Sequence, residues 1–162
     1  MAVQYGIKRR IPPTATMNGR VALAYIDDVA IMIADVAKWS DADVIQLLEE
    51  SARLGKRVTA PGAITHFLGE TLGGAASQRK MIVDWMEKNN IEPTPRTITL
   101  TDSALMRAAL TAYSWITKTE MKAFASKDLA PACVWLTRDL DTQAEDVRVA
   151  VEGCYQLLNK KI

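Results

Sequence analysis

The sequence has one histidine, two cysteines and almost no excess of either charge. Twenty Lys and Arg against nineteen Asp and Glu leave a formal net charge of +1, so no global field draws the chain to nucleic-acid phosphates or to an anionic membrane surface. Apolar runs of the roughly 18–20 residues that cross a bilayer are missing, as is an apolar amino-terminal signal segment. We therefore expect no nucleic-acid partner, no integral membrane association and a cytoplasmic location.

The residue types that carry most catalysis and metal binding are also scarce. Cys133 and Cys154 are widely spaced among apolar neighbours, which favours reduced core thiols over a disulfide framework or a metal knuckle. His66 has no potential ligands clustered near it, so a buried, hydrogen-bonded histidine is favoured over a catalytic base or a zinc ligand. The sequence predicts no catalytic residue, no metal and no cofactor.

A glycine-rich segment over 69–74 precedes a helical pattern, as the phosphate cradle of a nucleotide-binding protein does. Ala75 and Ala76 follow the last glycine, where a P-loop requires lysine and a hydroxyl residue. We interpret the segment as a turn.

Nearly half of the 162 residues are hydrophobic, which predicts one globular domain over 1–162. Pro12 and Pro13 interrupt the amino-terminal segment, so no strand is predicted there. Hydrophobic periodicity predicts strands over 21–26, 29–34, 57–67 (with a break at Pro61-Gly62), 97–101 and 121–125, and helices over 40–54, 77–90, 104–116, 126–136 and 142–159.

This alternation predicts an α/β fold with a mostly parallel sheet of about five strands, flanked by helices. The core of the domain is expected over about 21–137, with an extra carboxy-terminal helix over about 142–159 whose apolar stripe either folds back or supports a homodimer. Nine side chains are expected in or against the core: Ile31, Ile33, Trp85, Ile98, Leu100, Trp115, Phe124, Trp135 and Leu136.

A strand-to-helix corner at Asp102-Ser103 is the sharpest local feature, because both residues are preferred helix N-caps. From Thr97 to Leu136, the order of a strand, this polar corner, a helix, a strand ending at Phe124 and the run Ala132-Cys-Val-Trp-Leu136 resembles the SpoIIAA-like family. That family is related to the STAS domains of anti-sigma-factor antagonists and to the CRAL-TRIO lipid-binding proteins.

The resemblance implies a non-enzymatic binding or regulatory module that engages a protein partner at the carboxyl edge of the sheet. Asp102, Ser103 and Arg107 are the candidate binding residues, and open α/β sheets do bind ligands at this edge. A purely structural capping role for Asp102 and Ser103 is the alternative for these residues. For the whole protein, a carrier or sensor of a hydrophobic small molecule is the second hypothesis, and a small enzyme using His66 is the third.

Overall fold

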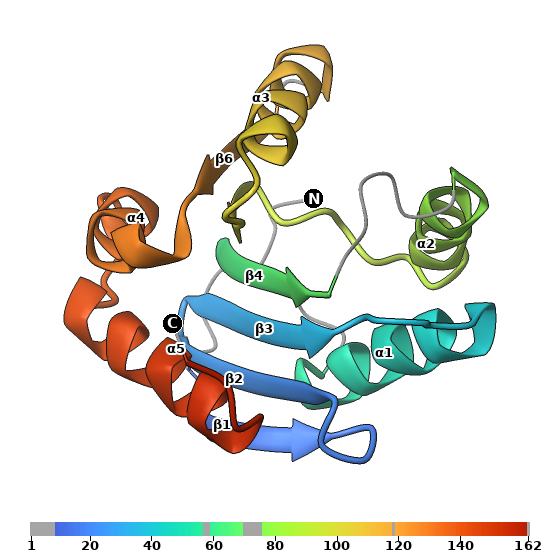
Figure 1. The fold of residues 1–162 in the computed structure, drawn as a ribbon, viewed down its shortest axis with the longest axis horizontal. Coiled ribbons are helices and arrows are strands. Elements are labelled where there is room, and N and C mark those ends of the chain that lie inside the picture. The colour runs from blue at the N-terminus through green and yellow to red at the C-terminus, as the bar shows by residue number, and fades with distance from the viewer. Residues whose placement is uncertain (1–8, 57–58, 70–75, 118, 162) are drawn as a thin grey trace.

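A six-stranded sheet runs through the molecule, with helices on both of its faces (Figure 1). The structure is a computed structural model, and it describes residues 9–56, 59–69, 76–117 and 119–161. The strands are β1 (Arg9–Thr16), β2 (Val21–Asp27), β3 (Val29–Asp35), β4 (Gly62–Leu68), β5 (Arg96–Leu100) and β6 (Glu120–Phe124). The helices are α1 (Asp41–Leu54), α2 (Ala76–Lys88), α3 (Ala104–Thr117), the short 3-10 helix η1 (Ser126–Asp128), α4 (Leu129–Thr137) and α5 (Ala144–Leu157).

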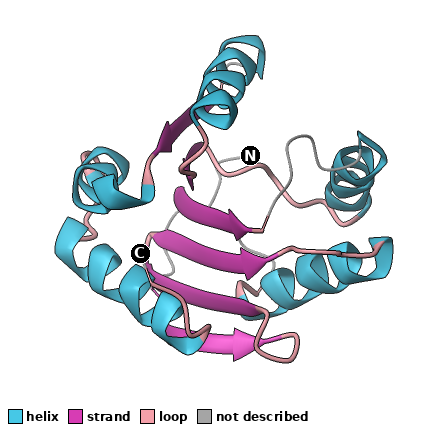
Figure 2. Cartoon of the chain, in the orientation of Figure 1, coloured by secondary structure: helices cyan, strands magenta, loops and turns pink. Residues whose placement is uncertain are grey.

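The strands follow one another across the sheet in sequence order. β1, β2 and β3 form an antiparallel meander, and β3, β4, β5 and β6 are parallel. Each parallel connection passes through a helix, because a parallel pair needs a crossover, and Figure 2 shows this alternation of strands (magenta) and helices (cyan). The predicted α/β class is confirmed, whereas the predicted count of about five strands is wrong.

The strand that the sequence analysis missed is β1, which contains Pro12 and Pro13. Its pairing with β2 shifts register between Ile11 and Thr14, so both prolines fall in the irregular stretch. β1 is also the edge of the sheet. A proline has no N–H to donate, and an edge strand with such an irregularity tolerates that loss.

The carboxy-terminal helix α5 packs against β1, β2 and β3. Val147, Val151 and Cys154 on its apolar stripe are fully buried, so the stripe folds back onto the sheet. The approach to β1 is close at Gly153, where an added Cβ would lie 2.9 Å from the Cγ of Pro13. The missed first strand and the last helix therefore support each other.

Alternation along the strands divides the core into two clusters. On β2, Ala22 and Ala24 face α4 and α5, whereas Val21 and Leu23 face α1. The cluster under α4 and α5 is the larger. Five of the predicted core residues belong to it and are at most 2% exposed: Ile31, Ile33, Ile98, Leu100 and Leu136.

The predicted aromatic core residues have mixed outcomes. Phe124 and Trp135 are partly buried against the larger cluster, as expected. Trp85 is half-buried and lies beside α1, outside both clusters, and Trp115 is 79% exposed. The prediction for Trp115 is wrong because α3 packs mainly on β6, and a helix with one neighbour buries only one of its sides.

A capping box begins α1, as the sequence predicts. The Ser40 hydroxyl accepts a hydrogen bond from the Asp43 amide at 3.2 Å, and the Asp43 carboxylate accepts one from the Ser40 amide at 2.8 Å.

Within the described ranges, no helix is both long enough and apolar enough to cross a membrane.

Candidate functional site at the carboxyl edge of the sheet

The carboxyl ends of β4, β5 and β6 lie side by side because these strands are parallel. His66 forms the last pair between β4 and β5, opposite Leu100. Asp102 follows β5, and Ser126 follows β6. The edge therefore collects polar side chains that are far apart in the sequence, at the place where open α/β sheets bind ligands.

Asp102 fastens the end of β5 to the segment after β6. Its carboxylate accepts hydrogen bonds from the Ser126 amide at 2.9 Å and from the Ser126 hydroxyl at 3.2 Å. The backbone continues the same connection, since the Thr101 amide donates to the Phe124 carbonyl at 2.8 Å. Asp102 thus bridges two strand ends, and the expected capping of α3 is left to Ser103.

Ser103 and Arg107 hold the first turn of α3 against the same corner. The Ser103 hydroxyl accepts a hydrogen bond from the Met106 amide at 3.2 Å, which is the N-cap interaction. The Arg107 guanidinium donates to the Thr101 carbonyl at 2.9 Å. Asp102 and Ser103 are exposed and Arg107 is half-buried, so the structure places all three predicted site residues at one corner.

His66 lies on β4, next to the Asp102 corner, and faces α5. Its Nδ1 shares a hydrogen bond with the Tyr155 hydroxyl, and the two rings meet edge to face with centroids 5.7 Å apart. Burial lowers the pKa of His66, and the negative charge of Asp102 opposes part of that effect. Burial, followed by the charge of Asp102, raises the pKa of Tyr155. His66 is therefore a neutral imidazole at pH 7, paired with a neutral phenol.

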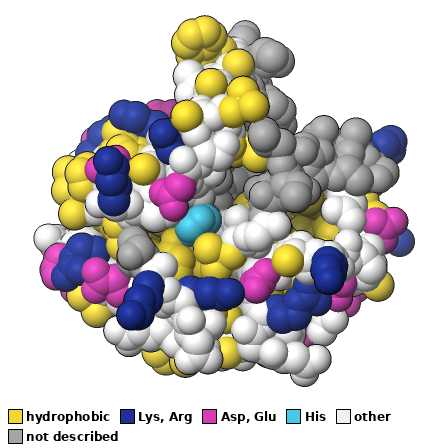
Figure 3. Space-filling view, in the orientation of Figure 1, with side chains coloured by type: hydrophobic (Ala, Val, Ile, Leu, Met, Phe, Trp, Pro, Cys, Tyr) yellow, Lys and Arg dark blue, Asp and Glu magenta, His cyan; other side chains and the backbone are white. Residues whose placement is uncertain are grey.

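Figure 3 shows the chain's only histidine (cyan) at the surface between α4, α5 and the base of α3, with an acidic side chain beside it. Only 9% of His66 is exposed, so little of the ring is available to a ligand. The predicted structural, hydrogen-bonded histidine agrees with this position.

Sequence reasoning missed Ser126 and Tyr155 as members of this corner. The sequence pattern predicts only a helix start at Ser126 and no role for Tyr155. A hydroxyl group next to the buried stripe of α5 was the available signal for Tyr155, because a buried phenol needs a hydrogen-bond partner. Its partner could not be identified without the fold, since 89 residues separate it from His66.

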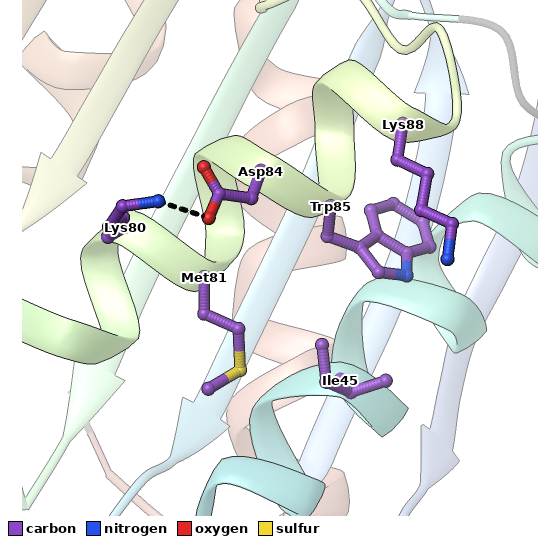
Figure 4. A pocket seen from close by; sticks show the side chains of 6 residues that line it. All are labelled: Ile45, Lys80, Met81, Asp84, Trp85 and Lys88. Carbon is purple, nitrogen blue, oxygen red and sulfur yellow. Dashed lines mark hydrogen bonds and ion pairs between the residues drawn. The ribbon is translucent and has the colours of Figure 1, made fainter.

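A second candidate site is a pocket between α1 and α2 with a volume of about 360 Å³ (Figure 4). Ile45 from α1 and Met81 and Trp85 from α2 form its apolar lining. Lys80, Asp84 and Lys88 complete the lining, and Lys80 forms an ion pair with Asp84 at 2.5 Å. The pocket is at the small end of the range for ligand sites, and it is open to solvent.

The glycine-rich segment predicted to be a turn lies outside the described residues beyond Gly69. Among the residues that the structure describes, no three His, Cys, Asp or Glu side chains come together as a metal site would require. Cys133 and Cys154 are buried free thiols, and burial raises the pKa of each to about 12. The prediction of core thiols is confirmed.

Comparison of the chain with protein-family models, with curated proteins and with solved structures finds no match.

Proposed function

We propose that this chain is a non-enzymatic binding or regulatory module that engages a protein partner through the carboxyl edge of its sheet. The observation that carries the proposal is the corner at Asp102, where hydrogen bonds fix the strand ends and the start of α3 while Asp102 and Ser103 stay exposed. A rigid, exposed polar surface binds a partner with little loss of conformational entropy. The resemblance of Thr97–Leu136 to the SpoIIAA-like family is the second support.

The hydrogen bonds of His66 and Ser126 also favour binding over catalysis. Nucleophilic catalysis needs a hydroxyl or thiol within reach of a base that is itself oriented by a third group. His66 instead shares its Nδ1 with a buried phenol, and the Ser126 hydroxyl donates to a carboxylate. The first hydrogen bond joins β4 to α5, and the second joins the ends of β5 and β6, so both stabilise the fold.

The test exploits two substitutions at Ser103 that separate charge from helix capping. Ser103→Asp keeps a good N-cap and adds a negative charge, whereas Ser103→Ala removes the cap and leaves the charge unchanged. The immobilised full chain is used to capture proteins from a lysate of the source cells, and the retained protein is identified by mass spectrometry, purified and titrated. Gln156→Glu, an exposed position on α5, is the control for the added charge.

We expect Ser103→Asp to weaken the affinity of the purified partner at least tenfold, with Ser103→Ala changing mainly the thermal stability and Gln156→Glu changing neither. Equal affinity of the wild type, Ser103→Asp and Ser103→Ala would contradict a role for this corner in partner binding.

The pocket between α1 and α2 favours a second candidate function, that of a carrier or sensor of a hydrophobic small molecule. Its apolar lining suits an alkyl chain or a ring, and Lys88 offers a cation to an acidic group. Native mass spectrometry of the freshly purified protein tests this candidate. A bound lipid-sized mass that is lost in Ile45→Glu and kept in Gln46→Glu, one residue away on the exposed side of α1, would support it, and a bare chain would count against it.

A further inference from the structure

The outer side of α3 is apolar and exposed. Leu105 is 63% exposed and Trp115 is 79% exposed. Ala108, Ala109 and Ala112 between them are exposed as well. At 100° per residue these five side chains fall on one stripe along the helix, and Figure 3 shows hydrophobic side chains (yellow) gathered on this part of the surface. We call these five residues the α3 stripe.

The opposite side of α3 faces the molecule and carries the helix's one charged residue. Arg107 is half-buried and donates to the Thr101 carbonyl, so its charge is directed away from the stripe. An ordinary surface helix has the reverse arrangement, with charges outside and apolar residues inside. The stripe is therefore a surface that stays partly unburied within one copy of the described structure.

We propose that the α3 stripe is a homodimer interface, in which α3 of one copy packs antiparallel against α3 of a second copy. The stripe is symmetric in size about residue 110, since large side chains lie five positions away on either side and alanines lie two positions away on either side. A two-fold axis at residue 110 places Leu105 against the partner's Trp115 and Ala108 against the partner's Ala112. A two-fold interface needs this kind of self-complementary surface.

Three further features favour a second copy over an unrelated partner. The stripe has no charged residue, so it offers no electrostatic match to a charged surface but pairs with itself without repulsion. The central alanines let the two helix axes approach to about 8 Å. At this distance Leu105 and Trp115 of one copy can contact Trp115 and Leu105 of the other. α3 also protrudes from the rest of the molecule, so two copies can meet along it (Figure 1).

The stripe is small compared with the interfaces of stable dimers. Trp115 offers on the order of 200 Å² of surface, and the whole stripe is smaller than the roughly 800 Å² per partner of a standard interface. We therefore expect a reversible dimer with a dissociation constant in the micromolar range. This inference concerns self-association and does not depend on the proposed partner at the carboxyl edge.

Sedimentation equilibrium of the full chain from about 1 to about 500 µM tests the dimer. We expect the weight-average mass to rise from 17.9 kDa toward twice that value. Ala108→Glu places two carboxylates beside the two-fold axis and should keep the chain monomeric. Val134→Glu, at a position 61% exposed on α4, adds the same charge elsewhere and should dimerise as the wild type does. A wild type that stays monomeric throughout, or a control that weakens the dimer as strongly, would overturn the proposal.

A pair of charge variants tests the antiparallel register. Leu105→Glu and Trp115→Lys should each weaken self-association at least tenfold. Mixed in equal amounts, they should form a heterodimer, because one end then joins a glutamate to a lysine and the other end keeps the native leucine and tryptophan. The far-UV circular dichroism of each variant should match the wild type, since both positions are exposed. Folded variants whose mixture shows no recovery would refute the antiparallel pairing.

Discussion

Replacing Tyr155 by Phe removes a single hydroxyl from the contact between α5 and β4. The ring is 2% exposed and its edge-to-face contact with His66 remains, so the change leaves no cavity. The Nδ1 of His66 loses its hydrogen-bond partner in a site that water barely reaches. A buried polar atom left without a partner costs about 1–3 kcal/mol. For a chain of this length, a loss near 2 kcal/mol lowers the melting temperature by about 4–8 °C.

Urea unfolding followed by circular dichroism measures this loss, and Tyr25→Phe is the matched control. The Tyr25 hydroxyl donates to the Ser51 carbonyl at 3.3 Å, and that carbonyl also accepts a hydrogen bond from the Gly55 amide at 2.9 Å. Tyr25→Phe therefore leaves no polar atom without a partner and should cost less than about 1 kcal/mol. In a His66→Leu background, Tyr155→Phe should cost almost nothing, because the hydroxyl has already lost its partner. A cost for Tyr155→Phe below about 0.5 kcal/mol, or one that is unchanged in the His66→Leu background, would refute the reasoning.

Three further predictions concern the same core. Burial holds the folded pKa of His66 below its ordinary 6.5, so the unfolded chain binds the proton first as the pH falls, and the free energy of unfolding should decrease from pH 7 to pH 5. This slope should flatten in His66→Gln; an unchanged slope would exclude His66 as its source. Leu136→Ala should cost about 2–5 kcal/mol in urea unfolding, because Leu136 is fully buried on the inner side of α4. Val134→Ala, at a position 61% exposed on the same helix, should cost less than about 0.5 kcal/mol. Cys133 and Cys154 should react with a thiol reagent only as the chain unfolds, because both are buried and their pKa values are raised to about 12; rapid reaction of the native protein would contradict their burial.

The pH window of the His66 effect separates it from the carboxylates. Hydrogen bonds from Ser40 lower the pKa of Asp43, and those from Arg96 lower the pKa of Glu120. Groups with a lowered acidic pKa stabilise the fold above their unfolded pKa near 4 and lose that contribution only as the pH falls below it. The interval from pH 7 to pH 5 therefore reports the histidine.

Features that depend on neighbouring residues could be predicted from the sequence alone. The capping box of Ser40 and Asp43 spans four residues, and both of its hydrogen bonds form within one turn of helix. The hairpin of β2 and β3 likewise needs only two apolar runs and the turn at Asp27-Asp28, where Asp27 takes a φ of +52°. Ser103 caps α3 for the same local reason.

Features that depend on long-range packing required the tertiary structure. Pro12 and Pro13 argue against a strand, and only the place of β1 at the sheet edge makes them compatible with one. α3 and α5 have similar apolar patterns but differ in how much of the pattern is buried. α5 packs on three strands, whereas α3 packs mainly on β6 and leaves Trp115 exposed. Asp102 meets Ser126 across 24 residues because parallel strands bring their carboxyl ends to one edge, and that edge is formed only when the sheet assembles.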